Sequence, residues 1–201
     1  MGDKQVFQPL TREDKITVVL YRIGIVVSTV IIAVLALLLA TASSGSGSLR
    51  TSLPADLLVY GLYASVGTCV FFIHLYIGKI KVYLKYLYYL SVVCLAVLLF
   101  IGKGSLTAAL GSGQYGPLLL LPLSGCLGFV TAKEAFCFQL FEGYLLAMIM
   151  PAYLLLVAGG LLTGTGVSSG LVLIAVVLAT FTLRKAFMPL AYDIGDKSAY
   201  Q

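Results

Sequence analysis

Residues 16–42 read ITVVLYRIGIVVSTVIIAVLALLLATA, an apolar stretch in which Arg22 is the one charged side chain. A helix needs roughly 20 apolar residues to cross the hydrocarbon core of a bilayer, and this stretch is longer than that. It also exceeds the roughly 7–15 residues of the apolar region in a secretory signal peptide. The stretch therefore predicts a retained membrane-spanning helix.

The polar residues before this stretch indicate where its helix begins. Thr11 precedes Arg12, Glu13 and Asp14, which is the pattern of an N-cap followed by carboxylates in the first turn, where the helix dipole favours them. We expect the helix to begin near Thr11, in water at one face of the membrane.

The rest of the chain repeats this pattern with shorter polar links. Pro117 and Pro122 predict that the fourth helix begins near the first proline and kinks near the second, and Pro151 interrupts the backbone hydrogen bonding of the fifth. Gly61 and Ser65 form a small-residue face that lets two helices approach closely. The five further apolar runs cover about residues 54–77, 83–101, 113–132, 143–162 and 167–183. The prediction is an all-α, polytopic membrane helical bundle of about six transmembrane helices, forming a single integral membrane domain over residues 1–201 with short terminal tails.

The composition excludes a soluble protein. Apolar residues make up 60% of the chain and charged residues 10%, against about 45–50% and about 25% in globular domains, and the mean hydropathy is +1.04. The links leave no room for an extramembrane enzyme domain. The net charge of +5 does not indicate nucleic-acid binding, because the basic residues lie at the ends of apolar runs.

The distribution of Lys and Arg predicts the orientation. Eleven fall in the links or the adjoining helix ends on one side of the six predicted helices: Lys4, Arg12, Lys15, Arg22, Lys79, Lys81, Lys85, Lys133, Arg184, Lys185 and Lys197. Only Arg50 and Lys103 fall on the other side. Because basic links stay in the cytoplasm, both termini are expected on the cytoplasmic side.

No catalytic motif is present, and we expect no enzyme activity. The sequence holds no GxSxG, HExxH, Walker A or EF-hand pattern. The four cysteines are spaced without a CxxC pair, so we interpret them as small packing residues.

His74 is the single histidine and the first candidate site residue. It is placed near the cytoplasmic end of the second helix with Phe71 and Tyr76 close in sequence, and Gly67 and Gly78 are expected to leave flat clearance for a macrocycle. An imidazole in such a place can ligate the magnesium of a chlorophyll. The alternative is an interfacial histidine hydrogen-bonded to a backbone carbonyl or a lipid headgroup.

The segment TAKEAFCFQLFEG, residues 131–143, joins the fourth and fifth predicted helices. We expect it to lie along the membrane interface, with Phe136, Phe138 and Phe141 as a partner-contacting aromatic shelf. Glu134 and Glu142 are candidates for binding a pigment metal or a partner's arginine. The alternative is an internal ion pair of Lys133 and Glu134 with Lys79 or Lys81 that closes the bundle.

The motif GFVTAKEAFCF, residues 128–138, resembles the signature of an uncharacterised family of integral membrane proteins, a domain of unknown function. The resemblance continues more weakly through FFIHLYIGKIK, residues 71–81, and through the six-helix layout. That family is found mainly in cyanobacteria and plastid-bearing lineages, which implies a thylakoid membrane with both termini on the cytoplasmic or stromal side.

In that setting, the expected function is non-enzymatic. The chain is expected to associate with a photosynthetic complex as a photosystem subunit, a pigment-binding accessory or an assembly factor, with chlorophyll and carotenoid as the expected cofactors. Its expected partners are the lipid bilayer and other membrane-protein subunits. The alternatives are a small-molecule transporter or channel and a membrane enzyme that acts on lipid.

Overall fold

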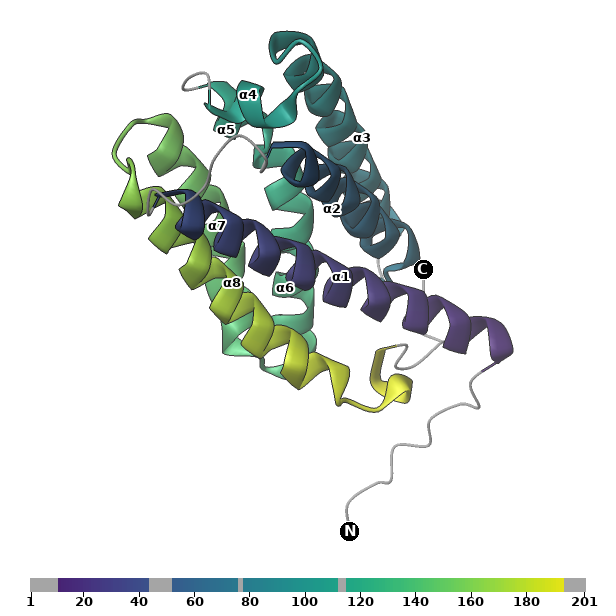
Figure 1. Cartoon of the computed structure of the whole chain (residues 1–201). Helices are drawn as coiled ribbons and strands as arrows, with labels where there is room; N and C mark the ends of the chain where they lie inside the picture. Colours follow the sequence, from purple (N-terminus) through teal and green to yellow (C-terminus); the bar gives the residue numbers. More distant parts are fainter. Residues whose placement is uncertain (1–10, 44–51, 76–77, 112–114, 194–201) are drawn as a thin grey trace.

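The computed structural model describes residues 11–43, 52–75, 78–111 and 115–193, and these residues fold into helices without any strand (Figure 1). The predicted all-α class is therefore confirmed. In chain order, the elements are α1 (Arg12–Ser43), α2 (Ser52–Phe72), α3 (Gly78–Ile101), α4 (Leu106–Gly111), α5 (Tyr115–Leu119), α6 (Leu121–Phe138), α7 (Phe141–Ala158), α8 (Thr165–Ala186) and the 3₁₀ helix η2 (Leu190–Asp193).

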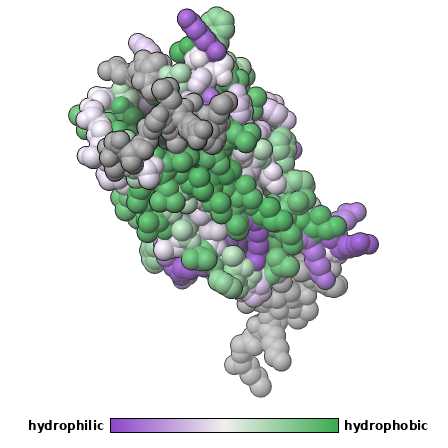
Figure 2. Space-filling model, in the orientation of Figure 1, coloured by the Kyte–Doolittle hydropathy of each residue, from purple (hydrophilic) through white to green (hydrophobic). Residues whose placement is uncertain are grey.

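Five of the described helices are long and apolar enough to cross a membrane: α1, α2 from Ala55, α3, α7 and α8. The helix α6 has the same length as α7 but contains Lys133 and Glu134. The polytopic membrane class is thus confirmed, while the count of six spans stays a prediction. Figure 2 shows hydrophobic residues over the middle of the visible face and hydrophilic residues gathered toward its two ends.

The helix α1 lies between α2 and α8, and α6 packs against α7 (Figure 1). The predicted small-residue face on α2 is confirmed, because the Ser65 hydroxyl lies 2.8 Å from that of Ser28 on α1. A Cβ atom on Gly24 would lie 2.7 Å from the Sγ of Cys69, so this glycine permits the close approach of α1 to α2.

The predicted N-cap and proline break are also confirmed. The Thr11 amide donates to the Asp14 carboxylate at 2.9 Å, and the Asp14 amide donates to the Thr11 hydroxyl at 3.3 Å, directly before α1. Pro117 lies in α5, and the helix is interrupted at Leu120 before α6 resumes with Pro122 in its first turn. Pro151 lies inside α7, which continues through it.

The segment 131–143 differs from the prediction of an interfacial link. The helix α6 continues through Phe138, and only Gln139 and Leu140 connect it to α7. Gln139 adopts the left-handed conformation, with φ of 55°, that ends α6. The charged residues Lys133 and Glu134 therefore lie within α6 rather than at its end, and both side chains find partners inside the bundle.

Candidate functional site: a buried charge cluster

A buried carboxylate, Glu134, lies at the end of the bundle where α6 turns into α7. Its side chain is inaccessible to solvent. Tyr21 of α1 donates its hydroxyl to Oε1 at 2.7 Å, Lys133 donates to the same oxygen at 2.7 Å, and Lys185 of α8 forms an ion pair with Oε2. One carboxylate thus joins α1, α6 and α8.

A second buried carboxylate, Asp193 of η2, extends this group toward the C-terminal end of the described chain. It pairs with Lys185 and accepts a hydrogen bond from Nε of Arg22 at 2.7 Å. Arg22 also donates to the carbonyl oxygens of Met188 at 2.5 Å and Pro189 at 3.1 Å. The segment after α8 is therefore fastened back onto α1.

We call Tyr21, Arg22, Lys133, Glu134, Lys185 and Asp193 together the charge cluster. It holds three basic and two acidic side chains, so it carries one positive charge in excess. Two aromatic rings add to it: Nζ of Lys185 lies 3.8 Å from the centroid of the Phe138 ring, and Nζ of Lys133 lies 5.4 Å from that of Tyr21. A cation over an aromatic face is attracted by the ring quadrupole.

Every charged member of the cluster is paired, and this limits its chemistry. Burying a lone charge is costly, whereas a paired and hydrogen-bonded charge is tolerated. The hydroxyl of Tyr21 is donated to the Glu134 carboxylate, so its proton is also engaged within the group. The arrangement holds α1, α6, α8 and η2 together at one end of the bundle.

His74 lies beside the cluster, in the segment that follows α2. Its Nε2 is 3.2 Å from the Thr17 hydroxyl, and that hydroxyl donates to backbone carbonyls of α1. Burial lowers the pKa of His74 below its ordinary value, and the nearby Lys133 and Lys81 lower it further, so the neutral ring is favoured.

The clearance expected beside His74 is filled on one side. A Cβ atom on Gly67 would lie 2.4 Å from the Tyr88 hydroxyl, so this tyrosine occupies the face where a macrocycle was expected. Phe71 packs edge-on against Tyr88, with ring centroids 5.8 Å apart. These residues do not fit a chlorophyll ring at Gly67. Ligation of a magnesium ion by His74 stays a prediction.

Glu142 lies outside the charge cluster. It forms an ion pair with Arg184 at 2.5 Å, and about half of the Arg184 side chain is exposed.

The predicted aromatic shelf is divided: Phe136 and Phe141 are each 80% exposed, whereas Phe138 is partly buried beneath Lys185. The three phenylalanines therefore do not form one contact surface.

The interpretation of Lys133 and Glu134 as an internal ion pair is confirmed, but the further partner is Lys185 rather than Lys79 or Lys81.

The cysteines are free thiols; Cys69 and Cys126 are buried, as packing residues should be, while Cys137 is exposed. Among the described residues, no three His, Cys, Asp or Glu side chains are grouped as a metal site.

Four members of the charge cluster were not predicted as site residues: Tyr21, Arg22, Lys185 and Asp193. Arg22 carried a usable signal, because a charge inside a membrane-length apolar stretch needs a partner. Asp193 carried no such signal, because it lies in a short segment beyond the last apolar run and is 171 positions away from Arg22 in the sequence.

The fold and the site define a polytopic helical membrane protein that is closed at one end by paired buried charges. A family model described as "Uncharacterized integral membrane protein (DUF2301)" matches residues 68–201. The chain belongs to this family, and contact with the lipid bilayer follows from that membership. No curated protein and no solved structure matches the chain.

Proposed function

We propose that this chain is a non-enzymatic membrane protein that docks onto other membrane-protein subunits through the turn between α6 and α7. The observation that carries the proposal is the 80% exposure of both Phe136 and Phe141 at a turn bordered by charged side chains. Aromatic residues are enriched at the centres of protein interfaces. We call these two residues the aromatic turn.

The proposed orientation places the aromatic turn on the cytoplasmic or stromal side. The contacts of Tyr21 with Glu134 and of Thr17 with His74 bring the start of α1 to the end of α6 and the end of α2. At the opposite end, the Thr107 amide donates to Asp56 at 2.7 Å, near the start of α2. Successive long helices therefore begin at alternate ends of the bundle. This arrangement supports six membrane crossings, including α6, with both termini on the side that is rich in Lys and Arg.

The proposed setting is a thylakoid membrane, with a photosynthetic complex as the partner. This part of the proposal rests on the resemblance of the 128–138 motif and on the absence of a recognisable catalytic motif in the sequence. Within that setting, the chain would act as a photosystem subunit, a pigment-binding accessory or an assembly factor. The alternative proposal, a transporter or channel for small molecules, requires a polar path, whereas the described cavity between the helices is lined mainly by aliphatic residues.

The test is co-purification after replacement of the aromatic turn. The double variant Phe136→Ser/Phe141→Ser should lose at least 90% of the co-migration of the wild-type protein with its complex on a native gel, because two exposed apolar side chains leave the interface. Insertion into the membrane should be unchanged. Phe138 is left intact, since its ring contacts Lys185 in the charge cluster.

The matched control is Phe100→Ser/Leu161→Ser. These residues are 88% and 76% exposed and lie at the other end of the bundle, at the end of α3 and just after α7. The control should co-migrate like the wild type. Equal co-migration of the two double variants would refute the aromatic turn as the docking site.

A further inference from the structure

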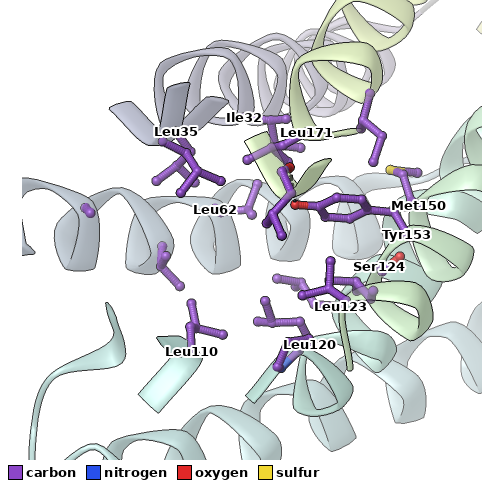
Figure 3. A pocket seen from close by; sticks show the side chains of 18 of the residues that line it. Ile32, Leu35, Leu62, Leu110, Leu120, Leu123, Ser124, Met150, Tyr153 and Leu171 are labelled. Atoms are coloured by element: carbon purple, nitrogen blue, oxygen red, sulfur yellow. Dashed lines mark hydrogen bonds between the residues drawn. The ribbon is translucent and has the colours of Figure 1, made fainter. Parts of the chain in front are cut away.

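A cavity of about 670 Å³ lies between the helices, in the half of the bundle away from the charge cluster. Its walls come from the second half of α1, α2 as far as Val66, the short helices α4 and α5, the start of α6, the second half of α7 and the start of α8. Figure 3 shows the side chains that point into it, including Ile32, Leu62, Leu123, Tyr153 and Leu171. Its volume is in the range of small-molecule binding pockets.

The polar atoms on the cavity wall are few, and most are already used. The Tyr153 hydroxyl donates to the carbonyl of Val167 at 2.9 Å, and the Thr107 hydroxyl lies 3.1 Å from that of Ser105. The Ser124 hydroxyl is buried without a hydrogen-bond partner among the described residues (Figure 3). A buried water needs two to four polar partners, so this cavity suits an apolar occupant better than water.

The cavity has the chemistry of a site for a chain-like lipid. Its aliphatic walls match methylene groups, and four of the helices that form them, α1, α2, α7 and α8, are long and apolar enough to cross a membrane. An unpaired hydroxyl in apolar surroundings is costly, and an oxygen on the occupant would satisfy Ser124. We propose that the cavity binds one membrane-derived hydrocarbon chain bearing an ester or hydroxyl oxygen, which accepts a hydrogen bond from Ser124.

Two sources share this chemistry: the acyl ester of a membrane lipid and an isoprenoid alcohol. The full chain, purified in a steroid-based detergent and washed free of bulk lipid, should melt at least 5 °C higher when either dioleoyl phosphatidylglycerol or geranylgeraniol is added. The probe that gives the larger shift identifies the source. No shift with either probe would overturn the proposal.

The variant that fills the cavity is Leu62→Trp/Leu171→Trp, with one added ring from α2 and one from α8. It should bind either probe at least tenfold more weakly, while its melting temperature without a probe stays at or above that of the delipidated wild type. The matched control, Leu57→Trp/Leu173→Trp, adds the same rings to the same helices at exposed positions and should bind like the wild type.

If the filled variant binds both probes like the control, the cavity is not the binding site, because the probes must then bind the outer surface. If the filled variant does not fold, lipid binding in the cavity is tested by comparing the melting shifts that the probes cause in the wild type and in Ser124→Ala. Ser124→Ala should bind the probes several-fold more weakly, and undiminished binding would remove Ser124 from the site. These results are independent of whether the aromatic turn docks a partner.

Discussion

Replacement of Glu134 by alanine is expected to lower the free energy of unfolding by about 3–5 kcal/mol, as is typical when one partner of a buried ion pair is removed. The Glu134 carboxylate accepts from Tyr21 and Lys133 and pairs with Lys185, whose side chain is 1% exposed. Without it, the cluster holds three cations and one carboxylate. The decrease in the free energy of unfolding is measured by unfolding the wild type and the variant in mixed micelles with a denaturing detergent.

The control for this prediction is Glu142→Ala, which removes a carboxylate only a few residues further along the chain. About half of the side chain of its partner, Arg184, is exposed, so the loss should stay below about 1 kcal/mol. Equal losses for the two variants would mean that the charge cluster does not hold the end of the bundle together.

The second large effect is expected at Gly143, in the first turn of α7. A Cβ atom there would lie 2.3 Å from the carbonyl oxygen of Thr131 and 2.9 Å from the Cβ of Ala135, both on α6. Neither atom is the end of a flexible side chain, so α6 and α7 must move apart. Gly143→Ala should therefore lower the free energy of unfolding by about 1–3 kcal/mol.

The matched control is Gly125→Ala in α6. Its added Cβ would lie 3.3 Å from Cδ2 of Leu87, a side-chain end that can shift. The change in stability should lie within about 0.5 kcal/mol. A Gly143→Ala variant as stable as this control would show that α6 and α7 are less closely packed than the structure has them.

The helices themselves could be predicted because their causes are local. The length and composition of residues 16–42 are enough to predict α1, and the Thr11 and Asp14 pattern predicts its start. The interruption at Leu120 follows from the spacing of Pro117 and Pro122. Each of these signals lies within one or two helical turns of the feature that it predicts.

The candidate site could be predicted only in part because it depends on contacts between distant residues. Lys185 meets Glu134 only through the packing of α8 near α6, and no periodicity within either segment specifies that register. Phe136 and Phe138 face different surroundings because α6 continues through both of them. Residues two apart on a helix point in nearly opposite directions, so Phe136 is exposed where Phe138 packs inward.

The proposed topology places the two ends of the bundle on opposite sides of one membrane, with the end that holds the charge cluster on the cytoplasmic or stromal side. Single-cysteine labelling with a membrane-impermeant reagent tests this, using Phe187→Cys and Leu161→Cys in a chain whose four native cysteines are replaced by alanine. Both positions are exposed, and they follow α8 and α7 respectively. With this topology, Phe187→Cys should be labelled from the cytoplasmic or stromal side only and Leu161→Cys from the opposite side only. Labelling of both from the same side would contradict it.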